Sequence, residues 1–135
     1  RYKITVDVQT RFRDTDAMGH VNNAVYLSYL ELARFEYVRQ VFGVTNWRDI
    51  DFIVARVEID YRSPAFVGEV LVVGARICRL GGASFDMDYS IVEKKASRVV
   101  AEAKSVQVCY DYKADKVKRL SEKFKETVRS YDGLA

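Results

Sequence analysis

The sequence predicts an α+β domain in which a mainly antiparallel sheet curves around one long helix. A run of about two dozen residues ending at Gly43 carries apolar side chains at helical spacing over most of its circumference. A helix that is apolar nearly all round is buried on most sides. Four strand-like segments then follow one another without helical crossovers, so pairing as hairpins is the default. A sheet that covers such a helix has to curve around it.

Length and composition predict a single globular domain over residues 1–135, large enough to bury a core. The net charge is only +3, from 22 basic and 19 acidic residues spread along the chain. That balance is too weak and too scattered for a nucleic-acid-binding protein. No apolar run approaches the length of a membrane span, and no signal peptide is recognisable, so we expect no membrane association and a cytoplasmic protein.

The two cysteines, Cys78 and Cys109, lie far apart and have no C-x-x-C spacing or histidine-rich neighbourhood. Neither a zinc site nor a disulfide framework is therefore expected, and a reducing compartment fits this usage best. We interpret both cysteines as small strand residues. The sequence implies no metal and no bound cofactor.

The first strand is predicted from Lys3 to Phe12, where apolar and polar residues alternate. The long helix follows a short polar loop, and Asn22 or Asn23 is the expected N-cap because an asparagine oxygen accepts from free N–H groups of the first turn. Gly43 is the expected C-cap, since glycine readily takes the left-handed conformation. The connection to the next strand, from Val44 to Asp51, contains Trp47 and is expected to pack over the end of the helix.

Three strands are expected next. The first runs from Phe52 to Arg62 and is closed by Pro64, the only proline. The second, from Glu69 to Leu80, is rich in apolar residues and should lie inside the sheet. After a Gly-Gly turn, the third runs from Ser84 to Lys94 with the cleanest alternation in the chain.

The last strand is expected from Arg98 to Tyr112, and its apolar phase slips between Ala103 and Val106. Such a slip of one residue indicates a β-bulge. A short amphipathic helix is then predicted from Ser121 to Tyr131, with Phe124 and Val128 as its contacts to the core.

The chemistry is expected in the loop before the long helix, which contains Asp14 and Asp16. The N-terminus of a helix carries roughly +0.5 of an elementary charge on its free N–H groups. It can therefore polarise a carbonyl whose oxygen becomes negative in a transition state. A carboxylate beside such an oxyanion site is the minimum needed to attack an acyl group.

Other catalytic arrangements are largely excluded. A single histidine, His20, rules out multi-histidine metal sites. The sequence contains no P-loop, no dinucleotide-binding glycine pattern and no complete nucleophile elbow. Carboxylate chemistry remains. His20 itself, next to two asparagines, is expected to orient or pack rather than to act as a base.

The segment DTDAMGHVNN from Asp14 to Asn23, followed by Tyr26 and Glu31, resembles the signature of hotdog-fold acyl-CoA thioesterases of the 4-hydroxybenzoyl-CoA thioesterase type. The resemblance extends over nearly the whole chain, because the strand pattern also fits that fold. It implies a hydrolase that cuts an acyl-CoA into a free acid and coenzyme A. It does not indicate which acyl group is cut.

The resemblance also assigns roles to residues. Asp16 matches the catalytic carboxylate, as a nucleophile or as a general base, and Asn23 matches the position whose backbone N–H polarises the thioester carbonyl. Relatives often carry Tyr or His at that second position, so asparagine is a departure. Further positions are expected to contact the substrate: Gly19, Asn22, Glu31, Arg62 and Ser84.

Several alternatives stay open at this stage. Asp14 is expected to shape the loop. Gly19 either lets the backbone approach the substrate or only makes the turn, and Glu31 either faces the acyl pocket or is solvated or paired with Arg34. Ser84 would be contributed by a neighbouring strand or subunit. The chain could also be a non-catalytic module that binds or senses acyl-CoA, or a hotdog dehydratase, for which His20 is poorly placed.

The resemblance further implies a homo-oligomer. Hotdog proteins form dimers whose sheets join edge to edge and whose sites are shared across the interface, and dimers of dimers (homotetramers) are common in this branch. The exposed edge of a five-stranded sheet is an independent physical reason for such pairing.

Overall fold

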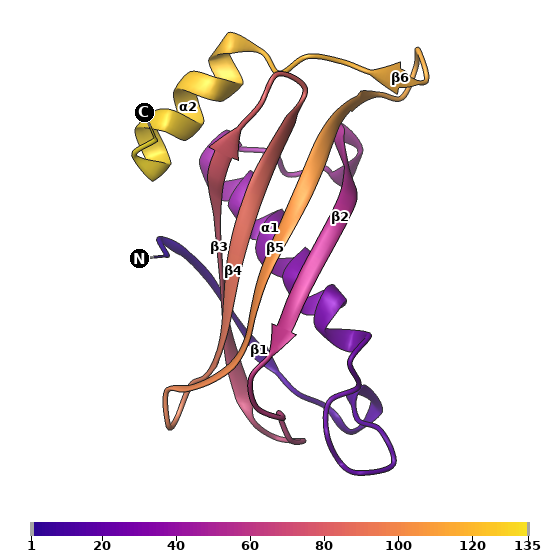
Figure 1. Ribbon diagram of the computed structural model, residues 1–135, viewed down its shortest axis with the longest axis vertical. Coiled ribbons are helices and arrows are strands. Elements are labelled where there is room, and N and C mark those ends of the chain that lie inside the picture. The colour runs from indigo at the N-terminus through magenta and orange to yellow at the C-terminus, as the bar shows by residue number, and fades with distance from the viewer. Residues whose placement is uncertain (1, 135) are drawn as a thin grey trace.

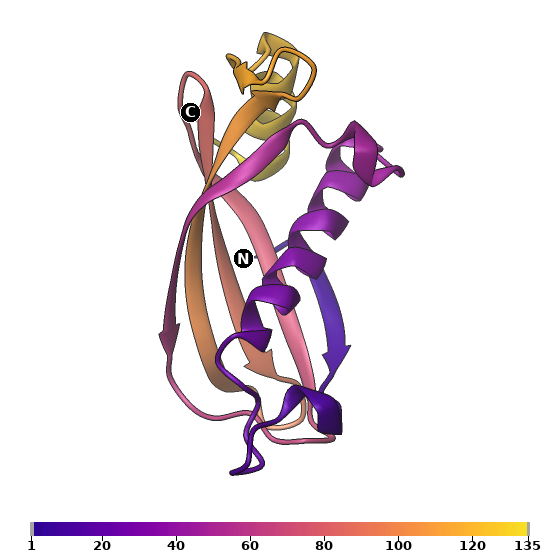
Figure 2. The same ribbon diagram turned by 90° about the vertical axis from the view of Figure 1, so that its right-hand side faces the viewer.

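One antiparallel sheet and a long helix make up most of the computed structural model, which describes residues 2–134 (Figure 1). In Figure 2 the helix α1 lies against the curved sheet, with β1 on one side of it and β2 on the other. The predicted fold class is confirmed. The elements are β1 (Ile4–Gln9), α1 (Val25–Phe42), β2 (Phe52–Tyr61), β3 (Val70–Leu80), β4 (Ser84–Glu93), β5 (Arg98–Asp111), β6 (Lys116–Val117) and α2 (Glu122–Asp132).

The strand order is β1-β3-β4-β5-β2, with the short β6 paired to β5. β3, β4 and β5 are consecutive hairpins, and β3 lies inside the sheet as predicted. The expectation of hairpin pairing is wrong for β2, which pairs with β5 while β1 takes the place beside β3. The reason is the connection after β2: it passes the loop before α1, where the Val21 N–H donates to the Ala65 carbonyl at 2.8 Å.

The core lies between α1 and the concave face of the sheet. The buried residues of the helix are Tyr26, Tyr29, Leu30, Ala33, Tyr37 and Val38. Their partners on the inner strands β3 and β4 include Leu71, Val73, Ile77, Phe85, Met87 and Ile91. The other side of the helix is open in the single chain, where Leu27 and Leu32 are 46% and 51% exposed. The prediction of a helix buried on most sides therefore holds only for the half that faces the sheet.

The sequence predicts the C-cap of α1 correctly but not its N-cap. Gly43 is the C-cap with a φ of 71°, as predicted, and its N–H donates to the Arg39 carbonyl. The predicted N-cap is wrong, because Ala24 precedes the first helical residue and no side chain caps the helix. The Asn22 Oδ1 instead accepts from the Ala24 N–H at 2.9 Å and closes a turn just before the helix.

β1 is shorter than predicted because the chain leaves the strand at Thr10. The Thr10 hydroxyl donates to the Phe66 and Glu69 carbonyls at 2.6 and 2.9 Å. A 3-10 helix from Phe12 to Asp14 follows, and a second one, from Trp47 to Asp49, lies in the connection after α1. Trp47 is 67% exposed rather than packed over the end of the helix.

In the middle of β5, polar residues lie on the buried face and apolar residues on the outer face. The predicted slip of one residue between Ala103 and Val106 is therefore wrong. The side chains of β5 that face α1 alternate without interruption: Ala101, Ala103, Ser105, Gln107 and Cys109. The bulge lies earlier, at Val100, the residue left unpaired opposite Ile91 and Val92. The apparent slip arises because polar residues occupy buried positions while Val106 and Val108 lie on the outer face.

The C-terminal helix α2 closes one end of the core, beside the β3–β4 turn (Figure 1). The Ser121 side chain caps it by accepting from the Phe124 N–H at 3.1 Å. Phe124 stacks on Phe42 with ring centroids 4.7 Å apart, and Val128 is fully buried, as predicted. The two cysteines are free strand residues. Within residues 2–134, neither α1 nor α2 combines the length and the hydropathy needed to cross a membrane.

We predict that Leu30→Ala lowers the free energy of unfolding by about 2–5 kcal/mol, because it leaves a cavity where α1 meets the sheet. Leu30 is 1% exposed. Val117→Ala is a suitable control, since Val117 is 54% exposed on β6 and its truncation should change stability by less than about 1 kcal/mol. Urea denaturation followed by circular dichroism measures both. Equal effects of the two substitutions would contradict the placement of the core.

Candidate active site

The loop from Thr15 to Val21 is a narrow turn held at its base. Thr15 and Val21 form an isolated antiparallel bridge, and His20 forms another with Phe66. The Asp16 N–H donates to the His20 carbonyl at 2.7 Å. Gly19 has a φ of +81°, a conformation that disfavours side chains, and a Cβ added there would meet no atom within 4 Å. Gly19 is therefore required by the turn itself rather than by lack of space.

The two carboxylate oxygens of Asp16 have different surroundings. Oδ1 accepts from the Met18 N–H at 2.8 Å and from the His20 N–H at 3.2 Å, so it fixes the turn. Oδ2 has no hydrogen-bond partner within residues 2–134. One oxygen thus orients the side chain and the other is available for chemistry.

Asp14 ties this loop to the helix, which agrees with the expected loop-forming role. It is 7% exposed, and its Oδ2 accepts from the Tyr29 hydroxyl at 2.9 Å and from the Arg11 N–H at 3.0 Å. Its carbonyl accepts from the Asn22 N–H at 2.8 Å. Burial, and then the Asp14 carboxylate, raise the pKa of Tyr29 far above its ordinary value. The Tyr29 hydroxyl therefore remains a hydrogen-bond donor over the whole physiological pH range.

The peptide between Asn23 and Ala24 is held at both ends. Its carbonyl oxygen accepts from the Tyr61 hydroxyl at 2.9 Å, and its N–H donates to the Asn22 side chain. The N–H of Asn23 itself has no acceptor in the described part of the chain. A free, fixed N–H just before a helix N-terminus is the kind of donor that stabilises an oxyanion.

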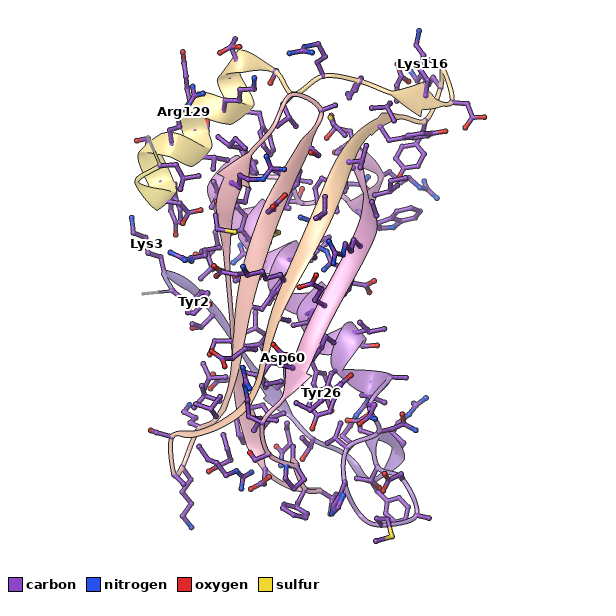
Figure 3. All side chains as sticks on the ribbon, viewed as in Figure 1. Tyr2, Lys3, Tyr26, Asp60, Lys116 and Arg129 are labelled. Atoms are coloured by element: carbon purple, nitrogen blue, oxygen red, sulfur yellow. The ribbon has the colours of Figure 1, made fainter. Side chains whose placement is uncertain are left out.

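Asp16 and Asn23 line the same pocket, which has a volume of about 270 Å³ and also includes His20, Tyr61 and Arg62. Tyr26, at the start of α1, lies near the end of β2 that carries Asp60 (Figure 3), and its ring contacts that of Tyr61 edge-on at 5.2 Å. The His20 ring packs edge-on against Phe66 at 5.1 Å, in keeping with the expected packing role.

The remaining predicted residues lie in different places. Arg62 borders the pocket, but its guanidinium is paired with Glu102 at 3.0 Å. Glu31 is exposed two turns into α1 and lines a separate groove, and within residues 2–134 it forms no ion pair with Arg34. Ser84 lies at the β3–β4 turn, at the opposite end of the sheet from the Asp16 loop (Figure 1). Within one chain, Ser84 and Glu31 are not brought to Asp16.

Tyr61 is a site residue that the sequence did not reveal. It is the last residue of β2 and looks like one more inward-facing strand residue. Its hydroxyl reaches Asn23 only because β2 is at the edge of the sheet next to the start of α1. The described residues contain no group of three or more His, Cys, Asp or Glu that could hold a metal ion.

Comparisons with known proteins show which family the chain resembles. The sequence model of the thioesterase-like superfamily matches residues 10–128. The long-chain acyl-CoA thioesterase FadM of Escherichia coli K12 is 31% identical over 121 residues, which cover 88% of this chain and 92% of FadM. The acyl-CoA thioester hydrolase YbgC of Escherichia coli O6:H1 is 28% identical over 107 residues, 77% of this chain and 79% of YbgC.

Among solved structures, a thioesterase from Thermus thermophilus, crystallised with coenzyme A and zinc, superposes with a TM-score of 0.88. It is 35% identical and the match covers 98% of this chain and 96% of the other. Together with the match of the family model, these similarities show that the chain belongs to the thioesterase-like superfamily and is a hotdog-fold thioester hydrolase.

Proposed function

We propose that this protein hydrolyses acyl-CoA thioesters to a free carboxylic acid and coenzyme A, with Asp16 as the catalytic carboxylate and the Asn23 N–H as the oxyanion donor. One observation carries the proposal: Asp16 and Asn23 line one small pocket, and a carboxylate oxygen of the first and the backbone N–H of the second have no partner within residues 2–134. The relatives named as acyl-CoA thioesterases support the choice of substrate.

Two routes are compatible with this geometry. In the first, the free oxygen of Asp16 adds to the thioester carbon, the thiolate of coenzyme A leaves, and water opens the resulting anhydride. In the second, Asp16 takes a proton from a water molecule that adds to the carbon, and the thiolate then leaves. In both routes the carbonyl oxygen becomes negative before the thiolate departs. The Asn23 N–H is the donor that stabilises this charge.

The coenzyme is proposed to enter past Arg62, at the border of the pocket, where Gly19 and Asn22 of the neighbouring loop are also exposed enough to contact it. A guanidinium suits phosphate because it donates two parallel hydrogen bonds. Arg62 would have to exchange its present ion pair with Glu102 for the phosphate. An exposed ion pair of this kind contributes less than about 1 kcal/mol to stability, so breaking it costs little free energy.

We further propose that two chains pair through the free edge of β2, as the resemblance implies. β2 bonds to β5 on one side only, and Ile53 and Val54 are 40% and 39% exposed. An unpaired edge with exposed apolar side chains favours association. Antiparallel pairing of the two edges would bring the Ser84 end of one chain toward the Asp16 end of the other. The same dimers could pair again into tetramers.

Asp16→Asn should lower kcat about 10³-fold or more in thiol-release assays with a panel of aliphatic and aromatic acyl-CoAs. That factor corresponds to about 4 kcal/mol of transition-state stabilisation. Asp115→Asn is the matched control, because Asp115 lies in the β5–β6 turn, away from the pocket, with a φ of 56° that asparagine tolerates. Unchanged turnover in Asp16→Asn would exclude Asp16. Tight binding of acyl-CoA without turnover in the unmodified protein would favour a sensor.

Tyr61→Phe should lower kcat about fivefold to tenfold and leave KM nearly unchanged. The substitution removes one hydrogen bond to the Asn23 carbonyl, worth about 1 kcal/mol, and so loosens the peptide that follows the proposed donor, which acts mainly in the transition state. Tyr110→Phe serves as the control, since the Tyr110 hydroxyl bonds only to Asp115. Steady-state kinetics measure both. A change confined to KM would instead place Tyr61 in substrate binding.

Val57→Pro should convert the protein from a dimer or larger assembly to a monomer of 15.5 kDa. The Arg62 N–H bonds to the Val100 carbonyl, so by the alternation of the antiparallel ladder the Val57 N–H points to the free edge of β2. Proline there removes an edge donor without breaking the pairing with β5. Val57→Ala keeps the donor and should stay associated in sedimentation velocity. A monomeric unmodified protein would refute the edge pairing.

A further inference from the structure

A largely apolar groove of about 1070 Å³ lies between α1, β1, β2 and the connection after α1. Its walls are mostly large apolar side chains from the helix, β2 and the connection between them: Leu32, Phe35, Trp47, Ile50, Phe52 and Val54. It shares Glu31 and Leu32 with a second depression, which reaches back to Asp14 and Val25 at the start of the helix. The two depressions therefore adjoin each other along α1, and the second lies beside the start of the helix.

Two arginines line this groove, Arg34 and Arg48. Arg48 is exposed, and its guanidinium lies over the Trp47 ring, 5.2 Å from the centroid. Arg34 is half-buried, and its Nη1 donates to the Tyr89 hydroxyl at 3.0 Å. No aspartate or glutamate forms an ion pair with it in the described part of the chain. The nearby Glu36 is occupied by Arg39 and Gln40. Glu31, one turn earlier on α1, is exposed and leaves Arg34 unpaired.

Arg34 is held in place by buried neutral groups. The Tyr89 hydroxyl contacts the Ser105 Oγ at 2.5 Å, Ser105 bonds to the Gln107 side chain, and the Gln107 Nε2 donates to the Phe85 carbonyl at 3.3 Å. Tyr89, Ser105 and Gln107 are each at most 1% exposed. If Tyr89 donates to Ser105, and Ser105 to Gln107, every hydroxyl hydrogen of the network is used. Nothing in this chain of hydrogen bonds neutralises the guanidinium.

This hydrogen-bond network explains why polar residues occupy the buried face in the middle of β5. Ser105 and Gln107 occupy positions where the alternation of an antiparallel strand calls for apolar residues, and together with Tyr89 they hold an arginine beneath the helix. A buried polar network costs free energy relative to apolar packing unless all its members are satisfied. Departures from the local pattern of this kind are expected at functional positions.

We propose that Arg34 makes this groove select acyl groups that carry a carboxylate at the end remote from the thioester, that is, ω-carboxyacyl-CoAs. The inference rests on the proposed acyl-CoA hydrolysis and names its substrate class. The apolar walls fit the methylene chain, and an arginine with free donors fits a carboxylate, with which it can form two parallel hydrogen bonds. Arg34 lies nine residues beyond Val25, roughly 14 Å along the helix, which leaves room for a chain of several carbons.

The test compares pairs of substrates of equal length, each an acyl-CoA and its ω-carboxy counterpart, from the hexanoyl to the hexadecanoyl series. The unmodified protein should have the higher kcat/KM for the ω-carboxy member at one or more lengths. Arg34→Met keeps the length of the side chain and removes its charge, so it should reduce that preference about tenfold to a hundredfold. Arg129→Met, which removes an exposed arginine of α2 outside the groove, is the control and should retain the preference.

The outcomes separate this inference from the proposed function. Hydrolysis of plain acyl-CoAs with no preference for the ω-carboxy member at any length would overturn the role of Arg34 and leave the thioesterase proposal intact. This result needs no variant, so it does not depend on whether Arg34→Met folds. A preference that survives in Arg34→Met would also overturn it, as would a variant whose only change is weaker dimerisation, which would make Arg34 an interface residue. No hydrolysis of any substrate would refute the proposed function itself.

Discussion

The packing of α1 onto the concave face of the sheet is the contact on which the rest of the molecule depends. Tyr29 and Leu30 anchor the first half of the helix, and Tyr37 anchors the second. The Tyr29 hydroxyl also donates to Asp14. The buried helix therefore fixes the position of the proposed catalytic loop. The site is therefore built on a rigid element, although its residues lie in a turn. Support from such an element is what gives a catalytic loop its precision.

The two proposed chemical roles are separated along the same helix. At its start, the Asn22 carbonyl accepts from the Val25 N–H at 2.9 Å, while the N–H of the same peptide, that of Asn23, has no acceptor in the described chain; Asn23 and Asp16 line one pocket. Near its middle, Arg34 reaches under the helix to the buried hydroxyl of Tyr89. The first arrangement concerns the bond that is broken, and the second concerns the acyl group that is accepted. Substitutions at the two places should accordingly change kcat and selectivity independently.

Much of the fold could be predicted because it follows from patterns that are local in sequence. Alternation placed β3 and β4, Gly43 marked the end of α1, and Ser121 marked the start of α2. The errors arose where more than one partner competes for the same group or position. Asn22 does not cap the helix because its side chain bonds to the Ala24 N–H, and β2 does not pair with β3 because β1 occupies that position.

The sequence by itself determined where the proposed catalytic loop lies, since Asp14, Asp16, Gly19 and Asn23 are contained within ten residues. Only the tertiary structure decided which of these groups are free: one oxygen of Asp16 is consumed by its own turn, while the Asn23 N–H is left without an acceptor in the described chain. Hydrogen bonding is a matter of geometry between groups, so composition cannot assign it. For the same reason Tyr61 and Arg34, whose partners are 38 and 55 positions away in the chain, become recognisable only after folding.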